Sequence, residues 1–359
     1  RQHERTPKGP KNSLSHHLAT HTFSAYPVES RLTMLYLAIV HLFSQLTRPA
    51  MTLFSKLLLG LAFLFIQFGV APASLADQSP PENCAERPYD KGRLWKVSKG
   101  DAVPSYIFGT MHSKDPRILH LPGVIMQVFM ASNTAVFETS LKDDELARNK
   151  QMMLLAPGQS LKEKIGDTRF IELSQIAAAY GMPPATLDRV KVWAAAAIIS
   201  QPPPTPQSDG HTLTLLDKEL EKSARQSGKR VIALETNAEQ LSIFDSMSDT
   251  VQLEYLDQAI DENHRLNEEL ETMTSYYLSG NTGWIACNLE ETLQETSSAL
   301  SEIMTTDLIY MRNQRMVERM LPELQRGNAF VGIGALHLPG DEGVLSLLEK
   351  LGYEIEQKY

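Results

Sequence analysis

Two histidines follow strand-like runs and share the same spacing from a glycine. In YIFGTMH, residues 106–112, Gly109 comes three residues before His112, and in FVGIGALHLPG, residues 330–340, Gly334 comes three residues before His337. A glycine at the carboxyl end of a strand lets the backbone turn sharply and lets another group approach closely. Each histidine would then project from the edge where open α/β sheets place their ligand sites.

Two glutamates also end strand-like runs, Glu138 in AVFET and Glu235 in IALET. Two neutral imidazoles that meet at one sheet edge are a suitable start for a Zn, Mn or Fe site. The glutamates can supply an oxygen ligand or a general base that acts on metal-bound water. The alternatives are a hydrogen-bonded turn residue for each histidine, and a helix N-cap or a salt bridge for each glutamate.

A further candidate is the stretch YMRNQRMVERM, in which Arg312 and Asn313 precede a methionine-rich helix face. The planar guanidinium of Arg312 can orient a carboxylate or stabilise an oxyanion of the substrate. The alternative is a helix whose methionine stripe packs into the core, and we assign Met311, Met316 and Met320 to that core.

The other three histidines after residue 76 are weaker candidates. His120 is expected to be structural, and His211 and His264 stand in polar surroundings and are expected to be exposed. The chain contains no Gly-x-Ser-x-Gly motif, no P-loop and no Gly-x-Gly-x-x-Gly fingerprint. These absences argue against an α/β-hydrolase nucleophile and against a motif-based nucleotide site.

The strands and helices that would position these residues are predicted in two stretches, residues 93–139 and residues 213–236 with 329–357. Residues 93–98, 105–110 and 133–139 read as strands, and a helix is predicted over 121–132. A strand over 229–236 follows a helix over 213–228, and the C-terminal part reads as strand 329–337, helix 344–352 and strand 353–357. The pattern predicts an α/β fold with two related halves of strands around a central mixed sheet, and with inserted helices.

Helices are predicted between these two halves. The segment 142–200 is helical in pattern, 201–210 is a proline-rich loop, and 237–326 is almost entirely helical with one break at 279–288.

The first 76 residues are predicted to lie outside the folded part. From Met51 the chain has one lysine, an apolar run and small residues that end at Ala76, which is the pattern of a secretory signal peptide over 51–76. The rival is a membrane anchor, but the uninterrupted apolar run is shorter than the roughly 20 residues of a spanning helix. Residues 1–50 are expected to be a disordered upstream extension, and residues 77–359 are expected to form a single domain.

The net charge limits the classes of binding partner, and the cysteine content bears on whether the chain contains a disulfide. Of the 34 Lys and Arg and the 43 Asp and Glu side chains, 7 and 2 respectively lie in residues 1–76, which leaves a net charge of about −14 on the remainder. Such a surface repels nucleic acid and anionic lipid. The two cysteines, Cys84 and Cys287, are expected to form a disulfide in an exported chain, and two free thiols are the alternative.

Taken in order, the motifs YIFGTMH, AVFET, LDKELEKSARQSGKRVIALET, MRNQRM and FVGIGALHLPGDEGVLSLLEKLGYEIE resemble the TraB/PrgY/GumN family, which includes the Tiki proteins. The resemblance runs from about Leu94 to Glu356. It implies a fold related to the erythromycin esterase and ChaN-like proteins (EreA/ChaN-like) and a metal-dependent protease activity. By the same resemblance His112, His337 and Glu138 would hold a divalent metal such as Mn, Co, Zn or Fe.

The remaining motif residues have implied supporting roles. Glu235 and Arg312 would assist catalysis with Glu138, while Asn313 and the turn glycines Gly109 and Gly334 would support the site. Tiki proteins are membrane-tethered, however, and the related ChaN binds haem, so the resemblance does not transfer a substrate.

We therefore expect an exported, periplasmic or secreted, metal-dependent hydrolase of peptidase type. Its expected partner is a peptide or protein substrate, with no nucleic acid and with no stable membrane anchor once the signal peptide is removed. The alternative is a non-catalytic periplasmic protein that binds haem or metal through the same histidines. A third interpretation is that the glycines and histidines only shape the ends of the sheet.

Overall fold

A computed structural model describes residues 80–81, 84–140, 143–204 and 215–359. In these residues one sheet contains six strands in the order β4-β3-β5-β2-β1-β6. The strands are β1 (Leu94–Ser98), β2 (Ser105–Thr110), β3 (Thr134–Thr139), β4 (Arg230–Glu235), β5 (Ala329–Gly334) and β6 (Glu354–Gln357). The four strands β4, β3, β5 and β2 run parallel, whereas β1 is antiparallel to both β2 and β6. The predicted mixed sheet is therefore confirmed.

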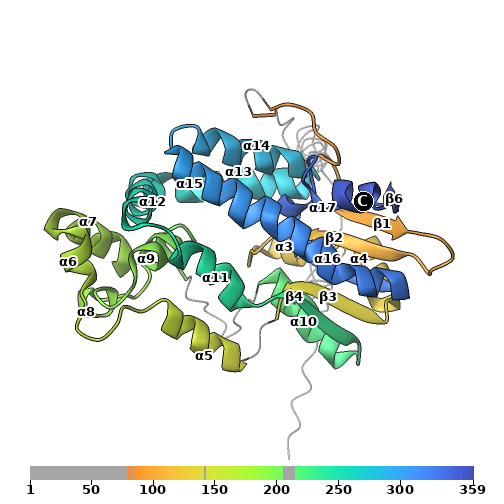
Figure 1. Ribbon diagram of the computed structural model, residues 1–359, viewed down its shortest axis with the longest axis horizontal. Coiled ribbons are helices and arrows are strands. Elements are labelled where there is room, and N and C mark those ends of the chain that lie inside the picture. Colours follow the sequence, from red (N-terminus) through yellow and green to blue (C-terminus); the bar gives the residue numbers. More distant parts are fainter. Residues whose placement is uncertain (1–79, 82–83, 141–142, 205–214) are drawn as a thin grey trace, which may run out of the picture. The chain divides into compact units, whose positions relative to one another are not determined.

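Helices connect these strands and cover both faces of the sheet (Figure 1). In the described residues they are α3 (Pro116–Leu119), α4 (Gly123–Ala131), α5 (Asp143–Met152), α6 (Leu161–Ile165), α7 (Asp167–Ala178), α8 (Pro184–Leu187), α9 (Val192–Ile199), α10 (Leu216–Gln226), α11 (Asn237–Asp245), α12 (Asp249–Glu262), α13 (Leu266–Leu278), α14 (Thr282–Leu293), α15 (Ser298–Glu302), α16 (Met311–Arg326) and α17 (Val344–Lys350). Three helices in the described residues are not α-helical. They are the 3₁₀-helices η1 (Asn263–Arg265) and η3 (Ala335–His337) and the π-helix η2 (Ile303–Tyr310).

Alternating side chains of the strands divide the core between the two faces. Ile107, Val136 and Val331 pack with Met316 and other residues of α16 and α17, whereas Phe108, Phe137 and Phe330 pack with α4 and α10. Successive residues of a strand point to opposite faces, so the apolar runs of these strands fill both cores. Helices α6 to α9 and α12 form a separate helical core around Trp193.

Two features differ from the prediction. The break expected at 279–288 is confined to residues 279–281, and Gly283 lies inside α14. A Cβ at this position would stand 2.5 Å from the Cβ of Asp90, so the close approach of Asp90 requires a glycine here. Met316 and Met320 are buried as predicted, but Met311 is 51 % exposed. Five residues advance an α-helix by about 140° beyond a full turn, so Met311 does not share the face of Met316.

Outside the sheet, the predicted bond between Cys84 and Cys287 is present, with the two Cα atoms 5.4 Å apart. It joins the segment before β1 to α14, 203 residues later in the chain. No helix in the described ranges is both long and apolar enough to cross a membrane. The predicted signal peptide 51–76 and the upstream residues 1–50 lie outside the described residues.

Candidate functional site at the carboxyl edge of the sheet

The carboxyl ends of the four parallel strands bring the predicted residues to one edge of the sheet. Thr110 of β2 is in register with Gly334 of β5, and Thr139 of β3 is in register with Glu235 of β4. Strand β5 stands between β2 and β3, so His112 and His337 follow neighbouring strands and Glu138 belongs to the next strand. The topology thus gathers side chains more than 200 residues apart in sequence.

His337 is buried, and its ring orientation is set by Asn313 of α16. The Nδ2 of Asn313 donates to the carbonyl of Glu342 (2.7 Å), so its Oδ1 faces Nδ1 of His337 at 2.6 Å. An amide oxygen only accepts hydrogen bonds, and Nδ1 of the neutral ring must therefore carry the proton. The unprotonated Nε2 then faces Glu138, whose Oε2 lies 3.9 Å away.

His112 is held in the corresponding way by a carboxylate. Its Nδ1 lies 2.7 Å from Oδ2 of Asp217, and Oδ1 of Asp217 accepts a hydrogen bond of 2.5 Å from Thr110. The ring of His112 is 56 % exposed and Nε2 makes no hydrogen bond within the described structure. Both histidines therefore have Nδ1 fixed by an oxygen acceptor and Nε2 without a hydrogen bond among the described residues, and Nε2 can bind a ligand in the neutral form of each ring.

Glu138 lies between the two histidine loops and the arginines of α16. Its Oε1 accepts from Gln240 (2.8 Å) and from Nη2 of Arg312, and its Oε2 accepts from the backbone N–H of Gly334 (3.1 Å). One lone pair of Oε2 remains on the side that faces His337. This carboxylate can therefore ligate a cation without losing its protein contacts.

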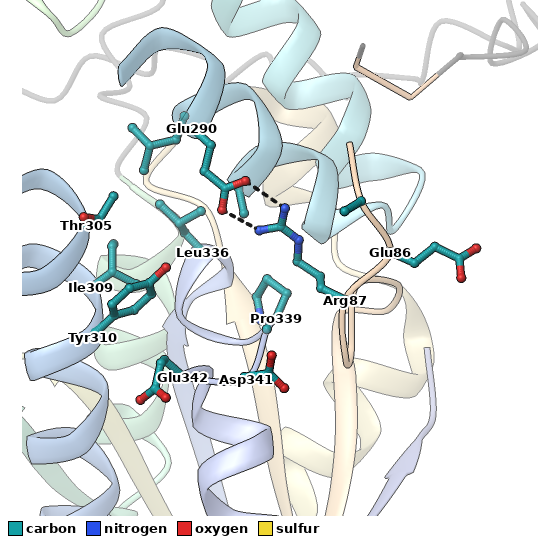
Figure 2. Close-up of a pocket in the computed structure, with 14 residues that line it drawn as sticks. Glu86, Arg87, Glu290, Thr305, Ile309, Tyr310, Leu336, Pro339, Asp341 and Glu342 are labelled. Carbon is teal, nitrogen blue, oxygen red and sulfur yellow. Dashed lines mark hydrogen bonds and ion pairs between the residues drawn. The ribbon is translucent and has the colours of Figure 1, made fainter. Parts of the chain in front are cut away.

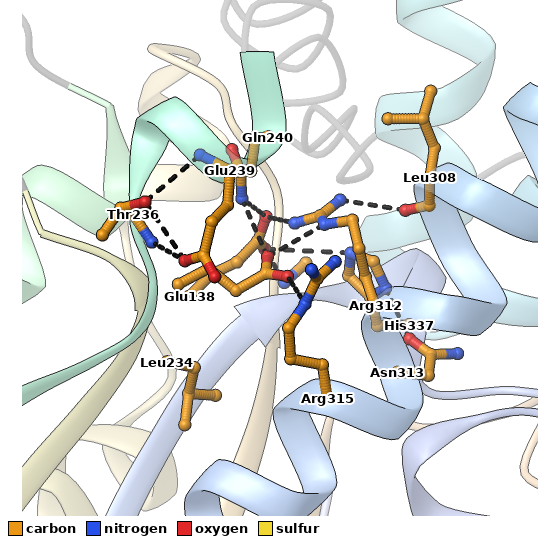
Figure 3. Close-up of polar contacts among 12 residues, drawn as sticks. Glu138, Leu234, Thr236, Glu239, Gln240, Leu308, Arg312, Asn313, Arg315 and His337 are labelled. Carbon is orange, nitrogen blue, oxygen red and sulfur yellow. Dashed lines mark hydrogen bonds and ion pairs between the residues drawn. The ribbon is translucent and has the colours of Figure 1, made fainter. Parts of the chain in front are cut away.

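Glu235 accepts hydrogen bonds from Arg312 and Arg315, which are labelled in Figure 3, and from the amide of Gln240 at 3.3 Å. Its Oε2 accepts from Nε of Arg312 (2.9 Å) and its Oε1 from Nε of Arg315 (3.0 Å), while its side chain is 0 % exposed. Arg312 also donates from Nη1 to the Leu308 carbonyl at 2.9 Å. Since Arg312 bridges both glutamates, this arrangement favours positioning roles for Glu235 and Arg312 over the predicted proton-transfer and oxyanion roles.

The two motif glycines permit close approach. Neither takes a positive φ, and Gly334 has an ordinary φ of −52°. A Cβ on Gly334 would stand 3.3 Å from Cδ2 of His337 and 3.4 Å from Oε2 of Glu138, and one on Gly109 would stand 3.1 Å from Cα of Ala335. The prediction of close approach is confirmed. The chain enters the 3₁₀-helix η3 directly after Gly334, but neither glycine uses the left-handed region there.

The electrostatics of the site separate the two histidines. Burial lowers the pKa of His337 to about 4, although Glu138 acts in the opposite direction, so His337 is neutral at pH 7. Around His112 the packed protein disfavours charge, but the hydrogen bond and charge of Asp217 prevail and raise its pKa to about 9. Burial raises the pKa of Glu138, yet His337, Arg312, His112 and the Gly334 N–H outweigh it and lower that pKa to about 2.

These side chains fit a divalent cation in donor type. Two imidazole nitrogens and one carboxylate oxygen match the three protein ligands of many catalytic zinc sites. Metal-ligating histidines usually donate their second N–H to a carboxylate or an amide or backbone oxygen, as both do here. Within the described ranges no group of three or more His, Cys, Asp and Glu side chains has the spacing of a metal site, so these side chains would have to draw closer.

A cavity of about 320 Å³ lies beside the loop that carries His337. Leu336, Ile309 and Tyr310 contribute apolar surface, and Asp341 and Glu342 contribute carboxylates (Figure 2). Arg87 closes one side through two bonds to Glu290, at 2.8 and 2.9 Å. The loop from η3 to α17 therefore carries His337 and also lines this cavity.

The other predicted histidines lie away from the site. His120 is exposed at the C-terminal end of α3, and His264 is exposed with Nδ1 2.7 Å from the Asp261 carbonyl. His211 lies outside the described residues. The sequence analysis did not identify Asp217 and Gln240, because both reach the site from helices and neither belongs to a strand-end pattern.

Comparison with known proteins agrees with this architecture. The chain is 25 % identical over 313 residues to "Metalloprotease TIKI2" of Danio rerio, which covers 73 % of this chain and 60 % of that protein. It is 24 % identical over 346 residues to "Metalloprotease TIKI1" of Xenopus tropicalis, covering 82 % and 67 %. It is 22 % identical over 326 residues to "Metalloprotease TIKI1" of Homo sapiens, covering 76 % and 64 %.

The matched region spans about 60 % of the length of the zebrafish relative. No solved structure matches the chain with significance. The family model described as TraB/PrgY/gumN family matches residues 93–357, which runs from just before β1 to the last residue of β6 and contains every site residue named above. The chain therefore belongs to the TraB/PrgY/gumN family.

Proposed function

We propose that this chain is an exported metal-dependent hydrolase that cleaves peptide bonds. The observation that carries the proposal is the convergence of His112, His337 and Glu138 at the carboxyl edge, with an Nε2 atom of each ring left free. The relatives named metalloproteases support peptides as the substrate class. Export and a periplasmic or secreted location are part of the proposal and rest on the signal-like sequence 51–76.

In this proposal His112, His337 and Glu138 hold the metal, whose identity among Mn, Co, Zn and Fe is open. A divalent cation bound by these residues would supply a water of lowered pKa and would polarise a substrate carbonyl. Asn313 keeps the Nε2 lone pair of His337 directed at the site, and Glu138 offers its one remaining Oε2 lone pair either to the metal as a ligand or to a proton as a general base. Arg312 fixes the orientation of Glu138 and ties it to Glu235.

The non-catalytic alternative is haem or metal binding without hydrolysis. A haem slot needs broad apolar walls, whereas the groups packed around His337 and Glu138 are the charged or polar side chains of Arg312, Asn313 and Gln240. This environment favours the hydrolase.

Metal content and peptide hydrolysis test the proposal together. The protein is purified without chelator, and its metal is measured by mass spectrometry beside the variant His112→Ala/His337→Ala. We expect stoichiometric divalent metal in the wild type and loss of both metal and chelator-sensitive hydrolysis of a peptide mixture in the double variant. His264→Ala, which replaces an exposed histidine far from the edge, is the matched control and should keep both.

Two outcomes contradict the proposal. Metal retained by the double variant would show that these histidines are not ligands. Metal bound by the wild type without peptide hydrolysis would favour the binder, and a visible absorption spectrum of the same sample would reveal haem.

A further inference from the structure

Asp217 is the first acidic residue of α10 and reaches His112 from outside the strand-end motifs. It is 105 residues from His112 in sequence, and its side chain is only 15 % exposed. Its two oxygens have different partners, Thr110 on Oδ1 and His112 on Oδ2. The carboxylate is therefore fixed at both ends by groups of β2 and of the loop that follows it.

The start of α10 is also fixed relative to His112. The backbone N–H of Leu216 donates to the carbonyl of Ser113, the residue after His112, at 3.3 Å. Leu216 and Leu220 are buried in the core cluster that includes Phe108 of β2. In the first turn of a helix the macrodipole favours an anionic side chain, which is the form of Asp217 that accepts two hydrogen bonds.

Thr110 determines which proton His112 can carry. A threonine hydroxyl that is directed at Oδ1 of Asp217 acts as a donor, and the ionised carboxylate then offers Oδ2 purely as an acceptor to Nδ1 of His112. The N–H of the neutral ring is thereby kept on Nδ1, and the lone pair is kept on Nε2. This is the tautomer that a metal ligand bound through Nε2 requires.

We infer that Asp217, held by Thr110, is a positioning residue that fixes the ring orientation and tautomer of His112 so that Nε2 can bind a divalent cation. The inference rests on the proposed function, because it assumes that His112 is a ligand. It adds a pair of residues from β2 and α10 to the site, and it corresponds to the role of Asn313 toward His337.

Asp217→Asn tests the inference because asparagine has almost the same shape but only one acceptor oxygen. Thr110 is a donor and would hold the amide oxygen, so the amide N–H groups would face Nδ1 of His112. Nδ1 would then become the acceptor and the proton would move to Nε2. We expect Zn²⁺ affinity of the metal-free protein, measured by calorimetry, to fall about 10- to 100-fold.

The double variant Thr110→Val/Asp217→Asn provides a sharper test. Without the Thr110 donor, the amide of residue 217 can rotate and direct its oxygen at His112, so we expect part of the Zn²⁺ affinity to return. Thr110→Val alone should have a small effect. Asp257→Asn is the matched control, because it removes a carboxylate of α12 that pairs with Arg169 of α7. It should leave the Zn²⁺ affinity unchanged.

The outcomes distinguish this inference from the proposed function. If wild-type protein binds no Zn²⁺, or if His337→Ala does not weaken binding, the proposed site fails and the inference fails with it. If wild-type binding requires His337 but Asp217→Asn binds Zn²⁺ as tightly as wild type, only the inference is overturned. A double variant weaker than Asp217→Asn would show a merely structural role.

A measurement on the wild type keeps the test independent of whether the variants fold. In metal-free protein labelled with ¹⁵N and kept at a pH above the raised pKa of His112, the ring is neutral and the shifts of its two nitrogens identify the protonated one. We expect protonation on Nδ1, and protonation on Nε2 would overturn the inference.

Discussion

Glu235 illustrates a carboxylate at a sheet edge whose oxygens serve other side chains. It is in register with the end of β3 next to Glu138, yet both of its oxygens accept from guanidinium groups of α16. Glu138 shares Arg312 with it but keeps an oxygen directed at His337. Two glutamates with the same local sequence pattern thus differ in what remains available for chemistry.

Glu235→Gln should destabilise the protein by about 3–5 kcal/mol, because it leaves the buried guanidinium of Arg312 without a full counter-charge. Urea denaturation gives the free energy of unfolding. Glu356→Gln is the matched control, since its exposed pairs with Lys96 and Lys358 should contribute little to the free energy of unfolding. Equal losses in the two variants would contradict the structural role of Glu235.

Residue types and strand-end positions were enough to predict which side chains meet at the edge. His112, His337, Glu138 and Glu235 each stand at or just after the end of a parallel strand, and parallel strands that neighbour one another must end on one side. Their metal-binding and catalytic roles stay predictions. Asp217, Gln240 and Arg315 could not be predicted, because their approach depends on how helices pack on the sheet.

At the scale of elements, the start of α11 is stabilised by a charged cap. Thr236 and Glu239 form a capping box in which the Thr236 hydroxyl accepts from the Glu239 N–H and Oε2 of Glu239 accepts from the Thr236 N–H. Arg319 of α16 donates to Oε1 of Glu239 at 2.7 Å. This contact links α11, which carries Gln240, to the helix that carries Arg312.

The pKa of Glu239 is lowered from its ordinary value of 4.5 to about 2, chiefly by the hydrogen bond from Arg319, although partial burial opposes the shift. Between these values the unfolded chain binds more protons than the folded chain. The contribution of Glu239 to the free energy of unfolding is therefore complete above about pH 4.5 and is lost as the pH falls toward 2.

We expect the stability difference between wild type and Glu239→Gln to shrink as the pH is lowered through this window. Urea denaturation at several pH values measures it. Glu302→Gln, which changes an exposed glutamate of α15, should show no comparable trend. A wild-type advantage that is constant across the window would contradict the assignment.

Elements were predicted best where apolar periodicity and glycine coincide. The strands of the sheet carry apolar residues on both faces, which made them recognisable without strict alternation. Met311 was misassigned because the methionine spacing was treated as one stripe, whereas the first interval does not match the helical period. The π-helix η2 before it was not predicted, because a wider turn leaves no residue-type signature in this segment.

At the scale of the whole molecule, the bond between Cys84 and Cys287 closes a loop across most of the described chain. Cross-linking distant residues restricts the unfolded ensemble more than cross-linking near ones. Under non-reducing conditions, which keep the wild-type disulfide intact, Cys84→Ser/Cys287→Ser should therefore lower the free energy of unfolding by about 2–5 kcal/mol. Urea denaturation at neutral pH measures this difference.

Wild-type protein treated with a reductant should resemble this double variant. If the double variant is as stable as the oxidised wild type, the bond does not contribute in this way.

The insertion of β5 between β2 and β3 bears on the order in which the proposed metal site is assembled. Strands β2 and β3 end at Thr110 and Thr139, 190 residues or more before β5 begins at Ala329, yet β5 lies between them in the sheet. His337 follows β5, so the three proposed ligands come together only after β5 has paired with both strands. In the proposed function, metal binding would therefore be one of the last steps of folding.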